Sequence, residues 1–167
     1  MDYDKNISDL QEKATTMISE FTTPINDIIA CVLENTECAA GKSHIRLSMD
    51  DLYAMAIRLP AECAYLQAQI NSQLIQQKVR SFLTEAKVTD TIVLLQNTKG
   101  DAKERQRRAE AMSKDDVLAD IVSQQIVAAL QATVQRADKV YEGIKKIIDA
   151  KSREFNYDNK PGGRIGT

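Results

Sequence analysis

The sequence predicts an all-α protein: a helical bundle with two long antiparallel helices that form a coiled-coil-like hairpin. Aromatic residues make up 5% of the 167 residues, and the chain contains six glycines and three prolines. Several strands and their turns would need more aromatic, β-branched and turn-forming residues than this composition offers. Long stretches also repeat apolar residues at intervals of three and four, which is typical of one helix face.

Residues 1–47 are expected to form a small N-terminal helical part. Apolar residues repeat at helical intervals in its first half, and a second helix is expected over 24–35. Thr23 would cap this second helix, and Pro24 would occupy its first turn, where the missing N–H of proline is harmless. No sustained period follows in 35–47, so a loop is expected there.

The helical hairpin is expected over residues 48–155. Ser48 begins its first helix, and Pro60 either kinks this helix or starts a new one. The helix then continues to about residue 96 with a rough apolar seam. The seam consists of Cys63, Leu66, Ile70, Leu74, Val79, Phe82, Leu83 and Ala86.

The returning helix is the longest periodic segment, from Val117 to about Phe155. Its apolar residues follow one another at steps of three or four: Ile126, Leu130, Val134, Ala137, Tyr141, Ile144 and Ile148. This spacing is close to the heptad of a coiled coil, so these side chains should pack against another long helix, within the chain or in a homo-oligomer. Residues 156–167 have no period and are expected to form a flexible tail.

Charge is distributed unevenly along the chain, although the net charge is −2. Residues 1–62 carry 5 basic and 11 acidic residues, whereas residues 99–167 carry 14 basic and 11 acidic residues. A protein that binds nucleic acid or a membrane over its whole surface would usually be basic throughout. Any contact with a polyanion should therefore be local and sensitive to salt.

The sequence indicates a reducing, cytoplasmic setting and no membrane partner. No secretory signal is recognised at the N-terminus, and the three cysteines form an odd set without a C-x-x-C pair. No apolar run approaches the roughly 20 residues that span a bilayer.

Signatures of catalysis or metal binding are weak. The single histidine, His44, lies beside basic residues that make it a poor general base. Cys31, Cys38 and Cys63 lack the spacing of a zinc site, and we expect Cys31 and Cys63 to be buried as small apolar residues. No glycine-rich phosphate loop is present in the right context. We therefore expect a protein that is not an enzyme and has no cofactor.

The strongest candidate for a binding surface is GDAKERQRRAEA, residues 100–111. Asp101 would cap a helix over 101–112, and the basic residues would then form one broad face: Lys103, Arg105, Arg107 and Arg108. Glu104 can reach Arg107 and Arg108, and Arg107 can reach Glu110. Because each such pair contributes only about 0.2–0.5 kcal/mol, the arginines stay available to phosphates. A solvated helix face without a ligand is the alternative.

A second basic group lies at the end of the last helix, where cations alternate with aromatic residues. The candidate nucleic-acid contacts there are Lys145, Lys146, Lys151, Arg153 and Tyr157. The phosphates of a single strand could pair with the cations while its bases stack on the rings. Basic residues are also favoured at helix C-termini by the helix dipole, which is the structural alternative. We expect a binding role only if both groups form one surface.

The order of these features, a Gln/Ala-rich helix, a polar turn, a basic helix start and a last helix ending ADKVYEGIKKIIDAKSRE, resembles phage proteins near the UvsY-type recombination mediators over about residues 60–155. The resemblance implies a phage-encoded accessory protein, in the cytoplasm of a bacterial host, that self-associates and binds single-stranded DNA to assist recombination or replication. It also implies four phosphate contacts: Lys103, Arg105, Arg107 and Arg108.

The acidic N-terminal part departs from the pattern of these mediators and supports a different hypothesis. In this alternative the protein is a protein-binding module, either a phage-encoded inhibitor of a host defence system or a helical adaptor. Residues 1–47 would then dock onto the basic surface of a host or phage protein.

Overall fold

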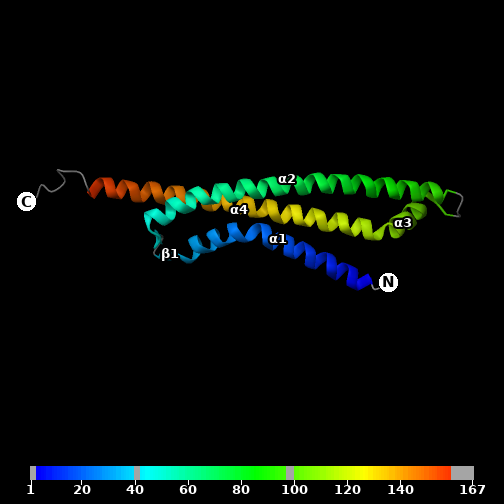
Figure 1. Ribbon diagram of the computed structural model, residues 1–167, viewed down its shortest axis with the longest axis horizontal. Helices are drawn as coiled ribbons and strands as arrows, with labels where there is room; N and C mark the ends of the chain where they lie inside the picture. Colours follow the sequence, from blue (N-terminus) through cyan, green and yellow to red (C-terminus); the bar gives the residue numbers. More distant parts are fainter. Residues whose placement is uncertain (1–2, 40–41, 97–99, 159–167) are drawn as a thin grey trace, which may run out of the picture. The chain divides into compact units, whose positions relative to one another are not determined.

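A computed structural model describes residues 3–39, 42–96 and 100–158 of the chain (Figure 1). The elements are α1 (Tyr3–Glu34), β1 (Thr36–Ala39), β2 (Lys42–Ile45), α2 (Met49–Leu94), α3 (Ala102–Met112) and α4 (Lys114–Asp158). The predicted all-α class is confirmed, because the four helices make up nearly all of the described chain. The two longest helices, α2 and α4, pack against each other. The predicted flexible tail begins inside α4, and its residues 159–167 lie outside the described part of the chain.

The chain divides into two compact units. Unit 1 consists of Met1–Phe21 and Gln67–Gln131, and unit 2 consists of Thr22–Leu66 and Ala132–Thr167. The helices α1, α2 and α4 each contribute residues to both units. For this reason the units do not coincide with the segments 1–47, 48–155 and 156–167 that the sequence suggested.

Helix α1 runs without interruption through Pro24, so the predicted start of a second helix at Pro24, with Thr23 as its cap, is wrong. The residues after Pro24 bury one helix face in unit 2: Ile25, Ile28, Ile29 and Val32. An interior proline costs about 3 kcal/mol, whereas burying one such side chain contributes about 1.5–3 kcal/mol. Four buried side chains therefore outweigh the proline. The apolar residues of the first half of α1, in unit 1, are only half-buried.

The predicted loop at 35–47 contains a two-stranded antiparallel hairpin. Thr36 pairs with Ile45 and Ala39 pairs with Lys42, and the N–H of Arg46 donates to the carbonyl of Asn35 (2.9 Å). Two residues connect the strands, which is the commonest hairpin length. Neither strand alternates apolar and polar residues clearly, so the periodicity that reveals most strands is absent here.

Helix α2 continues through Pro60, so a new helix does not start there. In unit 2 its inner face consists of Leu52, Leu59 and Leu66, all fully buried. In unit 1 the predicted seam is wrong in its second half, because Val79, Phe82 and Leu83 are exposed. Polar residues face α4 instead. Three pairs join the helices there: Arg80–Ser123 (2.9 Å), Ser81–Asp120 (2.8 Å) and Lys87–Asp116.

The numbering of these pairs falls along α4 as it rises along α2, so the two helices are antiparallel in unit 1. Of the seven residues expected to pack on α4, Ile126, Leu130, Ala137 and Ile144 are buried. The other three are half-buried: Val134, Tyr141 and Ile148. The buried positions thus follow the near-heptad spacing of the sequence along α4.

Helix α4 also contains a stretch that could cross a membrane by length and composition alone, contrary to the expectation from the sequence. It lies between Lys114 and Phe155, and 28% of the apolar window is buried within the protein. The core helix of a soluble bundle meets the same criterion. Asp116 and Asp120 of α4 form polar contacts with α2.

Candidate nucleic-acid interface

Helix α3 carries the first basic group and begins at the predicted cap. The carboxylate of Asp101 accepts a hydrogen bond from the N–H of Glu104 (2.7 Å), which satisfies one of the N–H groups that the first helical turn leaves without partners. Ala109 is the one buried residue of α3. Apart from the face around Ala109, this short polar helix is therefore open to solvent.

Arg105 has a structural contact in the turn that precedes α3. Its Nη1 donates to the carbonyl of Gly100 (3.0 Å), and the side chain is half-buried. Gly100 has a positive φ of 146°, a conformation that residues with a Cβ rarely adopt. A Cβ at this position would also lie 2.9 Å from the Oε2 atom of Glu104. Glycine and Arg105 together thus shape the turn.

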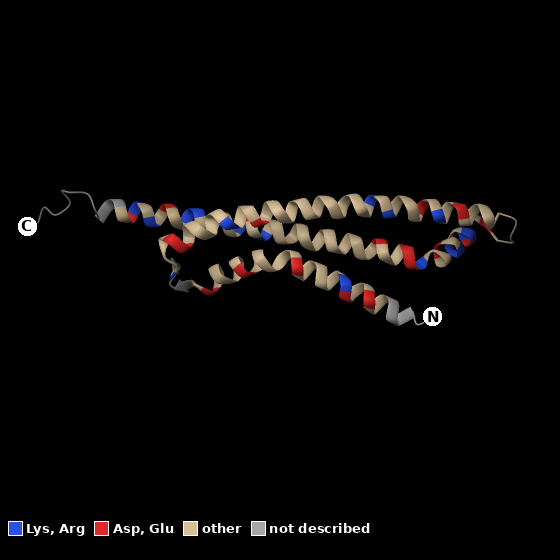
Figure 2. Cartoon of the chain, viewed as in Figure 1, with Lys and Arg blue, Asp and Glu red and all other residues tan. Residues whose placement is uncertain are grey.

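The other cations of α3 differ in how they are engaged. Arg108 pairs with Glu104 (2.5 Å) and keeps half of its side chain exposed. Lys103 and Arg107 are exposed, and neither forms an ion pair in the part of the chain that the structure describes. The expected contact between Arg107 and Glu110 is thus absent. Figure 2 shows the basic residues of α3 gathered on this short helix with acidic residues among them.

The second basic group lies near the end of α4, in unit 2. Lys145 pairs with Glu142 (3.0 Å) and lies over the ring of Tyr141, 5.2 Å from its centroid. The hydrogen bond to Glu142 and the negative charge of that carboxylate raise the pKa of Lys145. Lys151 donates to the carbonyl of Leu47 (2.8 Å) and so ties the segment before α2 to α4.

Lys146 and Arg153 are exposed near the end of α4. Tyr157 lies in the last turn of α4, and its side chain is outside the described residues. The two basic groups belong to different units: α3 to unit 1, and the end of α4 to unit 2. Neither unit by itself therefore holds the single basic surface that a joint binding role would require.

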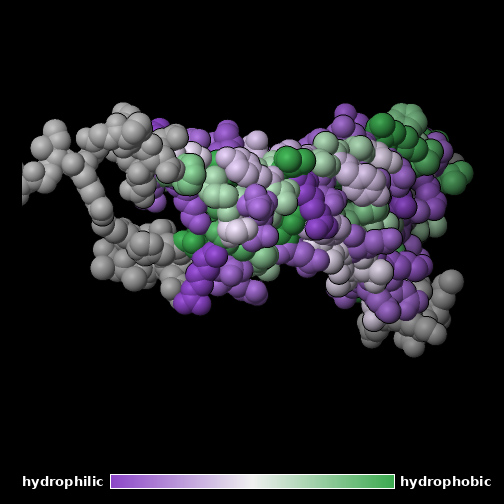
Figure 3. Space-filling view, turned by 60° about the vertical axis from the view of Figure 1, so that its left-hand side comes forward, coloured by the Kyte–Doolittle hydropathy of each residue, from purple (hydrophilic) through white to green (hydrophobic). Residues whose placement is uncertain are grey.

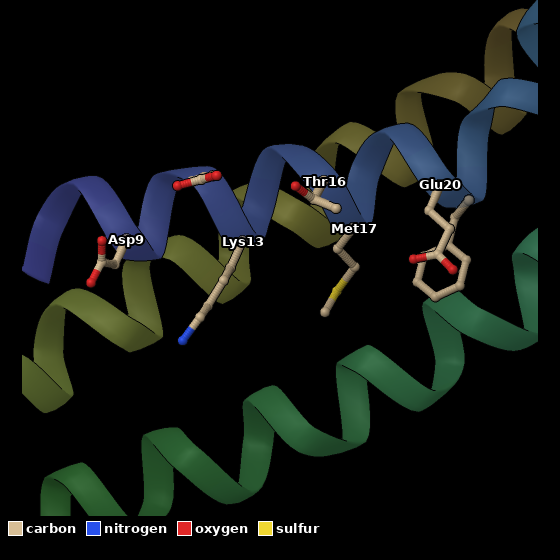
Figure 4. A pocket seen from close by; sticks show the side chains of 7 residues that line it. Asp9, Lys13, Thr16, Met17 and Glu20 are labelled. Atoms are coloured by element: carbon tan, nitrogen blue, oxygen red, sulfur yellow. The ribbon is translucent and has the colours of Figure 1, made fainter.

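A groove along α1 in unit 1 was not found from the sequence. It has a volume of about 580 Å³ and is lined by Asp9, Glu12, Lys13, Thr16, Met17, Glu20 and Phe21. We call it the acidic groove. Figure 4 shows Lys13 and Met17 pointing from α1 toward the neighbouring segment of α2. Acidic residues next to an apolar stripe were visible in the sequence, but the half-buried state of that stripe was not.

Groups suited to metal binding are absent among the described residues, where no cluster of three or more His, Cys, Asp or Glu side chains occurs. Cys31 and Cys63 are free thiols, half-buried rather than fully buried. Burial raises the pKa of the Cys63 thiol, and the carboxylates of Asp138 and Glu62 add to the effect. Cys38 and His44 lie in the hairpin, and their side chains are outside the described residues.

Comparison with known proteins adds no family to this description. No protein-family model matches the chain, and neither a curated protein nor a solved structure matches it. The resemblance to UvsY-type mediators therefore stays a prediction that depends on the order of helices and charges.

Proposed function

We propose that the protein is a non-enzymatic phage-type accessory protein that self-associates and binds single-stranded DNA to assist recombination or replication. The observation that carries this proposal is the row of exposed cations on α3. This row supports the proposal without the second basic group, which belongs to the other unit, so the proposal departs from the condition that both groups form one surface. Lys103 and Arg107 extend into solvent, and Arg108 stays half-exposed beside Glu104. Exposed Lys and Arg side chains bind phosphates without sequence preference, as an accessory protein on single strands requires.

Two other basic residues make contacts within the protein, and these contacts decide which cations are suitable for a test of phosphate binding. Arg105 is engaged with Gly100, and Lys151 is engaged with Leu47. Their replacement would disturb the turn before α3 or the anchoring of α2 in addition to any phosphate contact. Lys103 and Arg107 are the appropriate residues to change, because neither makes a described contact that supports the fold.

The test is a fluorescence anisotropy titration with a labelled single-stranded oligonucleotide at several salt concentrations. We expect the wild-type protein to bind at low salt and to release the strand as salt rises, since each phosphate contact contributes about −0.7 to the slope of log K against log salt. The double variant Lys103→Ala and Arg107→Ala should bind at least about tenfold more weakly, with a slope smaller by about 1.4.

A matched control removes two positive charges elsewhere, through Lys13→Ala and Arg58→Ala. Both side chains are exposed and lie outside the two basic groups. If the control loses as much affinity as the α3 variant, general charge and not α3 holds the strand. Absence of binding by the wild-type protein at low salt overturns the proposal.

A second candidate function, a protein-binding module, is favoured by the acidic groove on α1. Its carboxylates lie beside Met17 and Phe21, so it suits a basic amphipathic helix of a host or phage protein, as expected for a defence inhibitor or a helical adaptor. A labelled Lys/Leu amphipathic peptide is a suitable probe. Its binding should fall when Glu12→Gln and Glu20→Gln are combined, and no binding to the wild-type protein contradicts this candidate.

A further inference from the structure

Helix α2 exposes a regular row of apolar side chains in unit 1. Four large residues are Ile75, Val79, Phe82 and Leu83, which are 65%, 53%, 70% and 59% exposed. Together with Ala86 we call them the outer row. At 100° per residue, Ile75, Val79, Phe82 and Ala86 lie about 160° around the helix from Ser81 and Thr84, on the face of α2 turned away from α4. Leu83 lies at the edge of this face, where it lines a pocket with Asp116 and Ala119 of α4. Figure 3 shows hydrophobic residues at its upper right, where α2 is uppermost in Figure 1.

The spacing of the outer row is that of a coiled-coil seam. Ile75, Val79, Phe82 and Ala86 follow one another at steps of four, three and four. The inner face of α2 has the same period and is already occupied by α4. A second heptad seam on the outside of a helix is expected where another helix packs lengthwise against it. Scattered single apolar residues would not require such a partner.

The charges beside the outer row identify the partner. Lys78 and Glu85 are exposed, seven residues apart, and flank the same side of the row. Neither forms a salt bridge within the part of the chain that the structure describes. Two copies arranged antiparallel place Val79 against Phe82 and Ile75 against Ala86. In the same register Lys78 of each copy lies opposite Glu85 of the other, which produces two complementary pairs.

A parallel arrangement is disfavoured by the same charges. In a parallel coiled coil, a residue at the position of Glu85 faces the residue five positions later in the second helix, which is Asp90. Two carboxylates would then be neighbours. The antiparallel arrangement therefore satisfies both the apolar row and its flanking charges.

We propose that the outer row of α2 binds a second copy of this chain, forming an antiparallel two-fold dimer with Lys78 and Glu85 paired across the interface. The proposal rests on the self-association in the proposed function and not on nucleic-acid binding. At the exposed fractions given above, the four large side chains offer on the order of 400 Å² of apolar area per copy. With the flanking residues, the total approaches about 1,000 Å², the lower limit of specific interfaces. The dimer should accordingly be weak, with a Kd on the order of 1–10 µM.

Sedimentation equilibrium without nucleic acid tests the dimer. The wild-type protein should associate across this range, and Phe82→Glu should raise the Kd at least about tenfold, because a carboxylate would enter the centre of the row. Leu33→Glu is the matched control: Leu33 is 62% exposed on α1 and lies outside the row. Circular dichroism verifies that both variants keep their helices. A wild-type monomer at about 100 µM, or equal Kd values for Phe82→Glu and wild type, overturns the proposal.

A charge-reversal experiment tests the antiparallel register. Lys78→Glu makes both flanking positions acidic, and Glu85→Lys makes both basic. Each variant alone should dimerise more weakly than wild type, and an equimolar mixture should form heterodimers in preference to either homodimer. The double variant Lys78→Glu with Glu85→Lys should recover association. If the mixture shows no preference, the antiparallel register is wrong. Because these measurements contain no oligonucleotide, their outcome is independent of the DNA titration.

Discussion

The α2–α4 pair is held together differently in the two units. In unit 2, α2 contributes Leu52, Leu59 and Leu66, all fully buried, and α4 contributes Ala137 and Ile144. In unit 1, Ile70 is the last buried residue of α2 within the described part of the chain, and polar pairs follow it. The fully buried residues of α2 and α4 in unit 2 are thus apolar, whereas in unit 1 directional hydrogen bonds accompany buried Ile70, Ile126 and Leu130.

This difference explains how α2 can have an apolar outer row. Polar pairs such as Ser81–Asp120 fix the partner and the register, but each contributes little free energy. Because polar residues of α2 face α4 in unit 1, the apolar residues of the same segment are exposed on another face of the helix. We infer that unit 2 supplies most of the stability of the pair, whereas unit 1 carries the surfaces available for binding.

The largest effect is expected from removing a leucine of the unit 2 seam. Leu59→Ala should lower the free energy of unfolding by about 2–5 kcal/mol, since Leu59 is fully buried. Leu83→Ala is the matched control in unit 1 and should cost less than about 1 kcal/mol, because that side chain is mostly exposed. Urea unfolding at low protein concentration measures both. Equal losses would refute the division between the units.

A smaller effect is expected at the polar seam of unit 1. A double-mutant cycle with Ser81→Ala and Asp120→Ala should give a coupling of about 0.5–1.5 kcal/mol, the net contribution of one hydrogen bond. The cycle also removes the contribution of Gln124, which donates to Asp120 as well (3.1 Å). Ser81 with Asp115 is the control pair and should show no coupling. A coupling near zero for Ser81 and Asp120 would show that unit 1 does not depend on this contact.

The smallest effect concerns pH and Cys63 in unit 2. Burial, assisted by Asp138 and Glu62, raises the pKa of this thiol above 9.0, so the folded state favours the neutral form. The resulting stability is complete below the unfolded pKa and is lost as pH rises through the folded pKa, above about pH 9. In a Cys31→Ser, Cys38→Ser background, the ultraviolet absorbance of the thiolate should appear at higher pH in native than in urea-unfolded protein. The reverse order would contradict burial of Cys63 in the seam.

The main error of the sequence interpretation, the seam of α2, has a physical cause. Phe82 and Ser81 belong to two different rows of α2, each with three- and four-residue steps. The row of Phe82 was predicted to face α4 because it is the more hydrophobic. In the structure the row of Ser81 faces α4. Leu52, Leu59 and Leu66 recur every seven residues and lie on one face of α2. Ile70 follows Leu66 by four residues on the same face, and Gln77 and Thr84 then continue this face at steps of seven. A continuous helix keeps this phase, so the polar row faces α4.

The sequence by itself determined the helical class, the capped start of α3 and the packing positions of α4, because each depends on local periodicity or on one capping side chain. It also identified the cations of α3 and α4. Only the tertiary structure decided that α1 and α2 continue through Pro24 and Pro60, which row of α2 stays exposed, and which cations are engaged internally. These outcomes depend on burial and on partners distant in sequence, whose free energies exceed the local preferences of single residues.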